Sequence, residues 1–452
     1  MMPEKYTNLP LFKHTDRTFY IENLGCAKNQ VDAEAIVRYL EDGGWSLADS
    51  PEVAGCIIVN SCGFIRPAKE ESIETVLDFR KQYPDKKIIL AGCLAQRYGR
   101  GLSDLSDTVD GIFGNRALSR IAGFMENIGT GETGIFTGEH EEETPPRRRF
   151  FSLPGSVYVK ISEGCNNCCA FCAIPIIRGP LKSRGRASIV REIRELLRMG
   201  MYEINLIGQD LGSYGNDTGE GDITTLLSDI LELEGDFWIR LLYIHPDHFP
   251  GGLVDLCRQD GRVLPYFDIP FQHASEKILA RMGRRGNADT YLALADTIRS
   301  GLPGAVLRTT FLVGFPGETR KDFASLLRFQ QTLKPDWLGV FTYSREEGTP
   351  AASMSRLISV GSATAEGRRD ILMNAQARVT ERNMEKFVGK NLPVLIEEPV
   401  EGEDLALGRI YAQAPEVDGL TVVQSGDAEP GSVVNCRITG VTGYDLKASP
   451  TE

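Results

Sequence analysis

Four cysteines lie within eight residues of this chain, between Cys165 and Cys172. They follow the apolar run 157–162, which is predicted to form a β-strand. Cys165, Cys169 and Cys172 have the spacing Cys-x3-Cys-x2-Cys, which suits three thiolates on a 4Fe-4S cluster whose fourth iron stays open to a small molecule. Such a loop needs a scaffold that holds it at one end of a sheet, and this requirement constrains the fold more than any other feature.

The same cysteines can be divided differently. Cys165 with Cys168 and Cys169 with Cys172 would form two thiolate pairs suited to a structural zinc ion. Because the adjacent Cys168 and Cys169 would strain a tetrahedral site, the cluster is the preferred interpretation. Cys168 is then an extra thiol, either a bystander or a competing ligand.

Composition limits the cellular setting and the partner. Residues 1–17 lack the continuous apolar stretch of a signal peptide or membrane span, so we expect a cytoplasmic protein with no membrane contact. Ten cysteines in that compartment favour metal ligation over disulfides. The formal net charge of −12 argues against a general nucleic-acid binder and favours a basic partner.

A second set of cysteines is distributed over the N-terminal third of the chain. Short apolar runs alternate there with amphipathic stretches, which predicts βαβ units on a parallel sheet, with strands near 19–23, 56–60 and 87–91 and helices near 30–41 and 68–83. Cys26, Cys62 and Cys93 each lie just past a predicted strand, so the three thiols should converge on one edge of the sheet. Three small buried cysteines are the alternative. Their equivalent positions, each after a small residue, favour cluster ligation.

The middle of the chain repeats the alternation. Six strands are predicted near 157–162, 203–207, 238–243, 266–270, 306–313 and 337–343, with helices between them such as 189–199, 291–301 and 323–333. Six βα units suggest an incomplete barrel with its site at the carboxyl ends of the strands. Gln209 and Asp210 end the second strand beside the cysteine loop and are the candidates for cofactor contact. Other strand-end residues, such as His273 and Arg345, suit either ligand binding or structural hydrogen bonding.

The expected architecture is α/β with three domains and a linker. They are an N-terminal parallel-sheet βαβ domain at 17–129, a linker at 130–150, a central partial (β/α)6 barrel at 151–383 and a C-terminal antiparallel β-barrel at 386–452. A charged helix near 368–386 leads into the last domain, where short runs separated by Gly and Pro predict strands near 392–397, 407–412, 419–423 and 432–439.

Together these motifs resemble the methylthiotransferase branch of the radical S-adenosylmethionine (SAM) enzymes, from Thr18 to Ala448. The phrases that carry the likeness are 25–29, 60–65, 267–275 and 341–350. They look most like the members that modify an aspartate of the small-subunit ribosomal protein twelve. The family more often has a residue other than cysteine at Cys168.

The resemblance implies two 4Fe-4S clusters and SAM as cofactors. Cys165, Cys169 and Cys172 would hold the SAM cluster, and Cys26, Cys62 and Cys93 an auxiliary cluster that presents sulfur. The product would be a methylthio group on the β-carbon of the aspartate, and the C-terminal domain would be of the TRAM type. The partners would be a basic ribosomal protein, an electron donor such as flavodoxin or ferredoxin, and a sulfur source.

Two alternatives remain. A tRNA adenosine methylthiotransferase would share the architecture and chemistry, but residues 386–452 carry five basic against eleven acidic side chains, whereas a tRNA-gripping domain should show a basic face. A two-cluster electron carrier or a non-catalytic RNA-binding protein would hold the cysteines structurally. In that case replacing Cys165 should unfold the chain.

Overall fold

The computed structural model describes residues 17–105, 107–128, 134–139 and 145–451. The chain forms two compact units. One comprises the residues up to Phe151 together with Ala173–Pro180, and the other comprises Ser152–Cys172 and everything from Leu181 onward. No helix among the described residues has the length and apolar character needed to cross a membrane.

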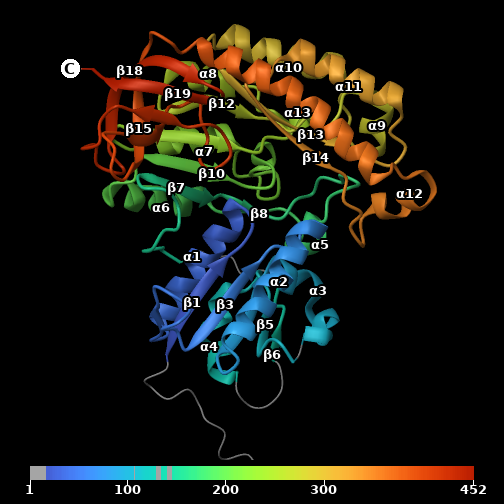
Figure 1. The fold of residues 1–452 in the computed structure, drawn as a ribbon, viewed down its shortest axis with the longest axis vertical. Coiled ribbons are helices and arrows are strands. Elements are labelled where there is room, and N and C mark those ends of the chain that lie inside the picture. The colour runs from blue at the N-terminus through green and yellow to red at the C-terminus, as the bar shows by residue number, and fades with distance from the viewer. Residues whose placement is uncertain (1–16, 106, 129–133, 140–144, 452) are drawn as a thin grey trace, which may run out of the picture. The chain divides into compact units, whose positions relative to one another are not determined.

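The N-terminal unit is a six-stranded, wholly parallel sheet in the order β2-β1-β3-β4-β5-β6, as Figure 1 shows in blue and cyan. Its strands are β1 (Thr18–Asn23), β2 (Ser46–Leu47), β3 (Cys56–Ser61), β4 (Lys87–Gly92), β5 (Gly111–Phe113) and β6 (Gly134–Phe136). Its helices are α1 (Ala27–Asp42), α2 (Arg66–Gln82), α3 (Cys93–Tyr98), α4 (Ile121–Asn127) and α5 (Ile174–Arg178).

Both faces of this sheet are buried, because successive residues of a strand point to opposite sides. Cys56 and Ile58 of β3 pack into one core with residues of α1 and α4. Ile57 and Val59 pack into a second core with residues of α2 and α3. Continuous apolar strands of this kind are typical of parallel sheets covered by helices on both sides. Cys56 is therefore a packing residue of the core.

The second unit contains an open, wholly parallel sheet in the order β7-β10-β11-β12-β13-β14. These strands are β7 (Ser156–Lys160), β10 (Glu203–Ile207), β11 (Trp238–Leu242), β12 (Val263–Asp268), β13 (Val306–Val313) and β14 (Trp337–Thr342). The helices are α6 (Arg186–Arg198), α7 (Ile223–Leu231), α8 (Leu253–Gln259), α9 (Glu276–Arg281), α10 (Ala288–Gly301), α11 (Arg320–Leu333), α12 (Pro350–Ile358) and α13 (Ser362–Glu385). The short strands β8 (Ser162–Glu163) and β9 (Lys182–Ser183) form a two-stranded sheet beside it. The six predicted βα units are confirmed.

The C-terminal strands close into a five-stranded barrel in the order β15-β16-β17-β19-β18. They are β15 (Asn391–Pro399), β16 (Ala406–Arg409), β17 (Thr421–Val423), β18 (Val433–Thr442) and β19 (Asp445–Pro450). The barrel is mixed, not wholly antiparallel as expected, since β17 and β19 run parallel. The reason is geometric, because strand directions cannot alternate all the way around a ring with an odd number of members.

Buried charges join this barrel to the parallel sheet of the same unit. The carboxylate of Glu203 on β10 is fully buried and accepts hydrogen bonds from Arg240 at 2.8 Å and from Arg409 on β16 at 2.6 Å. Arg409 also pairs with Glu397 of β15. Trp337 on β14 donates its indole N–H to the carbonyl of Ala412 at 2.8 Å. The barrel is thus built into the second unit through desolvated polar contacts.

The segment expected to be a linker, 130–150, contains an ordered strand. β6 pairs with β5 and completes the edge of the N-terminal sheet. Residues 130–133 and 140–144 of that segment lie outside the described residues. Farther along, Arg147 forms a buried ion pair with Glu34 of α1. The described parts of this segment therefore pack onto the N-terminal unit.

Candidate functional site

Three cysteines of the N-terminal unit lie where neighbouring strands end. Cys26 immediately precedes α1, Cys62 follows β3, and Cys93 is the first residue of α3, directly after β4. Because β1, β3 and β4 are adjacent and parallel, their carboxyl ends meet at one edge of the sheet. The structure thus brings together the three cysteines that the sequence singled out.

Glycines let the three cysteine loops approach one another closely. Gly25 has φ +101°, and a Cβ added to it would lie 3.1 Å from Cβ of Cys62. A Cβ added to Gly63 would lie 2.7 Å from the backbone carbonyl of Cys93. Side chains at these two positions would push the loops apart. The glycines therefore act as spacers that keep the cysteines close.

Cys93 has the most elaborate surroundings of the three cysteines. It is 6% exposed, and burial raises the pKa of its thiol to about 12, while the nearby charge of Arg178 acts in the opposite direction. Its Sγ lies 3.1 Å from Oδ1 of Asn29, 3.2 Å from Nδ2 of Asn115 and 3.2 Å from Nη2 of Arg178. Sequence reasoning missed Asn115 and Arg178, because they are far from Cys93 in the chain and match no spacing rule.

The donor set at this edge fits a three-cysteine cluster. Cys26 is exposed, Cys62 is half-buried and Cys93 is buried, and nearby cysteine charge contributes to raising the pKa of both Cys62 and Cys93, after the larger effect of burial. Among the described residues, no three Cys, His, Asp or Glu side chains gather tightly enough to bind a single metal ion. A 4Fe-4S cluster needs wider spacing, since each thiolate binds a different iron.

The second cysteine loop begins after β8 and is held in place from two sides. The backbone N–H of Ala170 donates to the carbonyl of Met282 at 2.9 Å, and the N–H of Ala351 donates to the carbonyl of Ala170 at 2.9 Å. Burial raises the pKa of Cys165 to about 11, and the backbone N–H of Asn167 opposes this by donating to its Sγ at 3.4 Å. These contacts fix the loop that carries the Cys-x3-Cys-x2-Cys spacing.

Cys168 differs from the other cysteines of this loop. Its side chain is exposed, and its thiol contacts the backbone carbonyl of Asn166 at 3.8 Å. Cys165, Cys169 and Cys172 are all half-buried. Burial raises the pKa of Cys169, and the charge of Arg284 opposes that rise. The environment thus separates the three spaced cysteines from Cys168 and favours the cluster arrangement over zinc pairing.

Asp210, a candidate for cofactor contact, connects several loops at the carboxyl end of the parallel sheet. Its carboxylate accepts hydrogen bonds from the side chains of His248 at 2.6 Å, Ser213 at 2.6 Å and Asn167 at 2.9 Å. It also accepts from the backbone N–H groups of His245 and Gly212. Burial alone would raise the pKa of Asp210, but the hydrogen bonds outweigh burial and hold the pKa well below its usual range. Asp210 therefore positions the cysteine loop through Asn167.

Gln209, the other candidate for cofactor contact, has an unused acceptor. Its Nε2 donates to Glu163 at 3.2 Å, and within the described part of the chain its buried Oε1 has no hydrogen-bond partner. A buried acceptor of this kind suits a donor group on a bound ligand. Among the other strand-end residues, His273 is fully buried beside Glu318, at 3.6 Å, and so lies in the interior.

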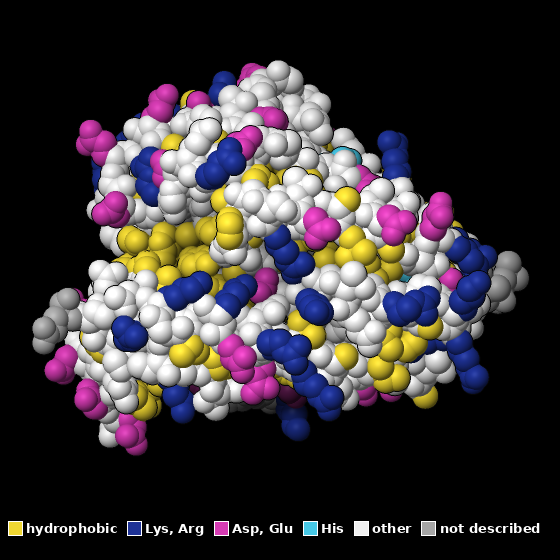
Figure 2. Space-filling model, turned by 90° about the horizontal axis from the view of Figure 1, so that it is seen from above, with side chains coloured by type: hydrophobic (Ala, Val, Ile, Leu, Met, Phe, Trp, Pro, Cys, Tyr) yellow, Lys and Arg dark blue, Asp and Glu magenta, His cyan; other side chains and the backbone are white. Residues whose placement is uncertain are grey.

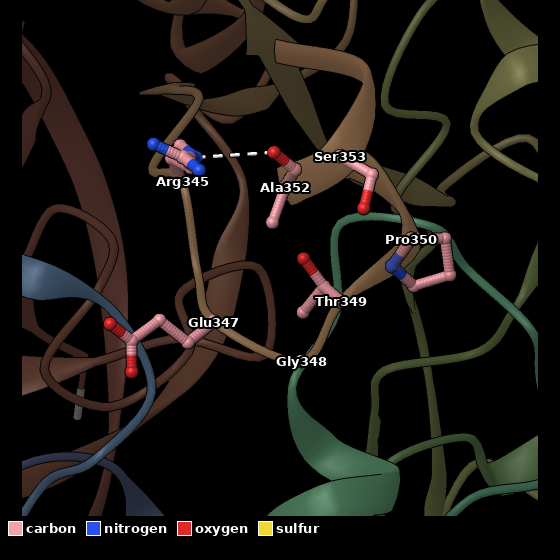
Figure 3. Close-up of a pocket in the computed structure, with 7 residues that line it drawn as sticks. All are labelled: Arg345, Glu347, Gly348, Thr349, Pro350, Ala352 and Ser353. Atoms are coloured by element: carbon pink, nitrogen blue, oxygen red, sulfur yellow. Dashed lines mark hydrogen bonds between the residues drawn. The ribbon is translucent and has the colours of Figure 1, made fainter. Parts of the chain in front are cut away.

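A cavity of about 660 Å³ adjoins the second cysteine loop. Its lining comes from the segment between β14 and α12 and from the first turn of α12 (Figure 3), namely Arg345, Glu347, Gly348, Thr349, Pro350, Ala352 and Ser353. The guanidinium of Arg345 is anchored through Nε to the carbonyl of Ala352 at 3.1 Å. Ala351 in this segment is the residue that hydrogen-bonds Ala170 of the cysteine loop. The cavity has the size of a ligand pocket and lies at the end of the sheet where ligands bind.

An open parallel sheet with this cysteine loop after its first strand defines a radical SAM enzyme, and residues 159–329 match the radical SAM superfamily. Residues 18–114 match the family described as Uncharacterized protein family UPF0004, and residues 388–450 match the TRAM domain.

Curated relatives identify the family more narrowly. Ribosomal protein uS12 methylthiotransferase RimO of Treponema denticola is 44% identical over 464 residues, covering 94% of this chain and 98% of that protein. The protein of the same name from Syntrophomonas wolfei is 41% identical, with 94% and 98% covered. The chain belongs to the ribosomal protein uS12 methylthiotransferase family.

Solved structures agree at the level of the fold. The radical SAM methyltransferase TsrM from Kitasatospora setae superposes with a TM-score of 0.55 at 15% identity, covering 74% of each chain. The cobalamin-dependent SAM radical enzyme OxsB gives a TM-score of 0.52 at 13% identity, covering 85% of this chain and 63% of that one. At these identities the likeness concerns architecture alone.

Proposed function

We propose that this chain attaches a methylthio group to the β-carbon of an aspartate in ribosomal protein uS12. The observation that carries the proposal is the presence of two separate three-cysteine sites in one chain of this family. Cys165, Cys169 and Cys172 would hold a 4Fe-4S cluster with one iron left for SAM. When bound, that pair supplies a radical able to take hydrogen from an unactivated C–H bond, which no acid–base residue can ionise at neutral pH.

The second site would supply the sulfur. Cys26, Cys62 and Cys93 would hold the auxiliary cluster, because they lie on three loops that meet at one sheet edge. Three ligands again leave one iron open to an external group. The reaction also needs an electron donor, for which flavodoxin or ferredoxin is suited, and a source of sulfide. Action on a ribosomal protein supports a cytoplasmic setting.

The residues of the chain itself position and shield the reaction. Asp210 holds Asn167 and the His245–His248 segment at the carboxyl end of the sheet, which fixes the cysteine loop. Gln209 offers its unpaired Oε1 to SAM. The cavity between Arg345 and Ser353 would receive the substrate loop. Positioning of this kind is the main contribution that a protein makes to chemistry carried by a cofactor.

A tRNA substrate is the second candidate, and the C-terminal barrel argues against it. Of the five basic side chains in residues 386–452, Arg409 is buried against Glu203 and Glu397, and Lys386 pairs with Asp336 at 2.6 Å. Figure 2 shows one face of the molecule, on which both basic and acidic side chains occur. A domain that binds the phosphate backbone of tRNA needs a continuous basic face. An acidic barrel is better suited to a basic protein.

The deciding experiment offers both substrates to the reconstituted enzyme under anaerobic conditions with SAM, reductant and sulfide. Mass spectrometry should find a methylthio adduct on an aspartate of uS12 and none on tRNA. An adduct on tRNA alone would overturn the substrate, and absence of 5′-deoxyadenosine would overturn the chemistry. Cys165→Ala should remain folded by circular dichroism but be inactive, whereas the matched variant Cys168→Ala should retain activity, because that side chain is exposed.

A further inference from the structure

The guanidinium of Arg178 is buried at the auxiliary cysteine site. Arg178 is 1% exposed and is the last residue of α5, which belongs to the N-terminal unit although it follows the second cysteine loop in the chain. Its Nη2 lies 2.8 Å from Oδ1 of Asn29, 2.9 Å from Oδ2 of Asp32 and 3.2 Å from Sγ of Cys93. A buried guanidinium that contacts a predicted cluster ligand requires an explanation beyond packing.

Two donors lie beside the sulfur of Cys93. Nη2 of Arg178 and Nδ2 of Asn115 are each 3.2 Å from Sγ. Nη2 of Arg178 also donates to Oδ1 of Asn29 at 2.8 Å, which holds the guanidinium next to this sulfur. The geometry therefore places one charged donor and one amide donor at the atom that would bind iron.

The contact also has an electrostatic consequence. Reduction adds negative charge to a cluster, and a nearby positive charge or an N–H donor to a ligand sulfur stabilises the reduced form. Arg178 supplies both to Cys93. Asp32, which is 1% exposed and pairs with Arg178, acts in the opposite direction because its charge is negative.

We propose that Arg178 is a positioning residue that orients the Cys93 thiolate and raises the reduction potential of the cluster held by Cys26, Cys62 and Cys93. This inference rests on the auxiliary cluster assigned under the proposed function. The competing interpretation is that Arg178 only neutralises Asp32 or anchors α5 to the N-terminal unit. The two interpretations predict different changes of the reduction potential among single variants, so the experiment can distinguish them.

The test uses the full chain with Cys165, Cys169 and Cys172 all changed to Ala, so that only the auxiliary cluster is reconstituted. Iron and sulfide content are measured first, followed by a redox titration monitored by electron paramagnetic resonance. With R178Q we expect the ratio of reduced to oxidised cluster at a fixed potential to fall at least tenfold, which is about 59 mV for a one-electron couple. R178K, which keeps the positive charge, should shift the reduction potential less than R178Q does.

Two further variants keep the test decisive if R178Q fails to fold. D32N removes the opposing charge and should shift the potential upward. R116Q is the matched control, since Arg116 anchors α5 by donating to the carbonyls of Ile176 and Ile177. It should leave the potential unchanged. An R116Q shift equal to that of R178Q, or an unchanged potential in D32N, would overturn the role of Arg178.

The two proposals fail in distinguishable ways. If the triple-Ala chain binds no iron and sulfide, the auxiliary cluster site itself is wrong, and the inference about Arg178 is wrong with it. If the cluster forms and its potential is the same in R178Q and the parent, the site stands and only the role of Arg178 is overturned.

Discussion

Replacing Arg409 with Met should destabilise the second unit by about 3–5 kcal/mol, the usual cost of breaking a buried ion pair. Met keeps much of the apolar stem but removes the guanidinium. Glu203 then loses contacts at 2.6 and 3.2 Å, but keeps Arg240 at 2.8 Å and the hydroxyl of Ser156 at 2.8 Å. Glu397 loses its ion-pair partner. Retention of Arg240 places the expected loss toward the lower end of this range.

Urea unfolding followed by tryptophan fluorescence measures this loss, because two of the three tryptophans, Trp238 and Trp337, lie in the second unit. With a slope of roughly 3 kcal/mol per molar urea, the midpoint should fall by about 1 M or more. The matched control is R437M, an exposed arginine of the same barrel, which should change stability by no more than about 0.5 kcal/mol. A midpoint for R409M within error of R437M would refute the argument that this charge network stabilises the unit.

Three further perturbations follow from the sites. Cys168→Ser should leave the iron content of the reconstituted protein unchanged, since Cys168 is exposed and outside the Cys-x3-Cys-x2-Cys set; loss of iron would make it a ligand. Gly25→Ala should cost roughly 1–3 kcal/mol of stability and lower the occupancy of the auxiliary cluster. The reason is that the new Cβ would sit on a residue with φ +101° and lie 3.1 Å from Cβ of Cys62. Unchanged unfolding and iron content would contradict this. The hydrogen bond that His248 donates to Asp210 raises the pKa of His248. The stability that this bond contributes is therefore present below about pH 6.5 and is lost as pH rises through the raised folded-state pKa. H248Q should remove that part of the pH dependence of unfolding, and an identical pH profile would exclude the pair as its source.

The sequence was sufficient to predict the two parallel sheets, because each long strand is a buried apolar run. β10 and β13 begin and end at the predicted residues. β5 and β6 were missed, since each has only three residues and begins with Gly, too little for a periodic signal. β19 was missed as well, and it forms the parallel pair that the expected antiparallel barrel lacked.

The residues of the candidate site also fall into those that the sequence could predict and those that it could not. Ligand cysteines could be identified because spacing and strand ends are local features of the sequence. The side chains that hydrogen-bond to the site residues could not be identified from the sequence. Asp210 receives hydrogen bonds from segments as distant as Asn167 and His248, and Cys93 meets Asn115 and Arg178 only through the tertiary fold. Composition and periodicity contain no information about contacts of this kind.

The placement of α5 has a consequence for how this protein is made and dissected. Residues 173–180 complete the N-terminal unit after the chain has already begun the second one. During synthesis, Asp32 and Cys93 remain without Arg178 until that later segment has emerged, so the first unit cannot reach its final packing before the second has started. A truncation after Phe151 would remove the contact of Arg178 with the buried carboxylate of Asp32. The two units are therefore interleaved in sequence, and exchanging one of them between relatives requires transplanting two separate pieces of chain.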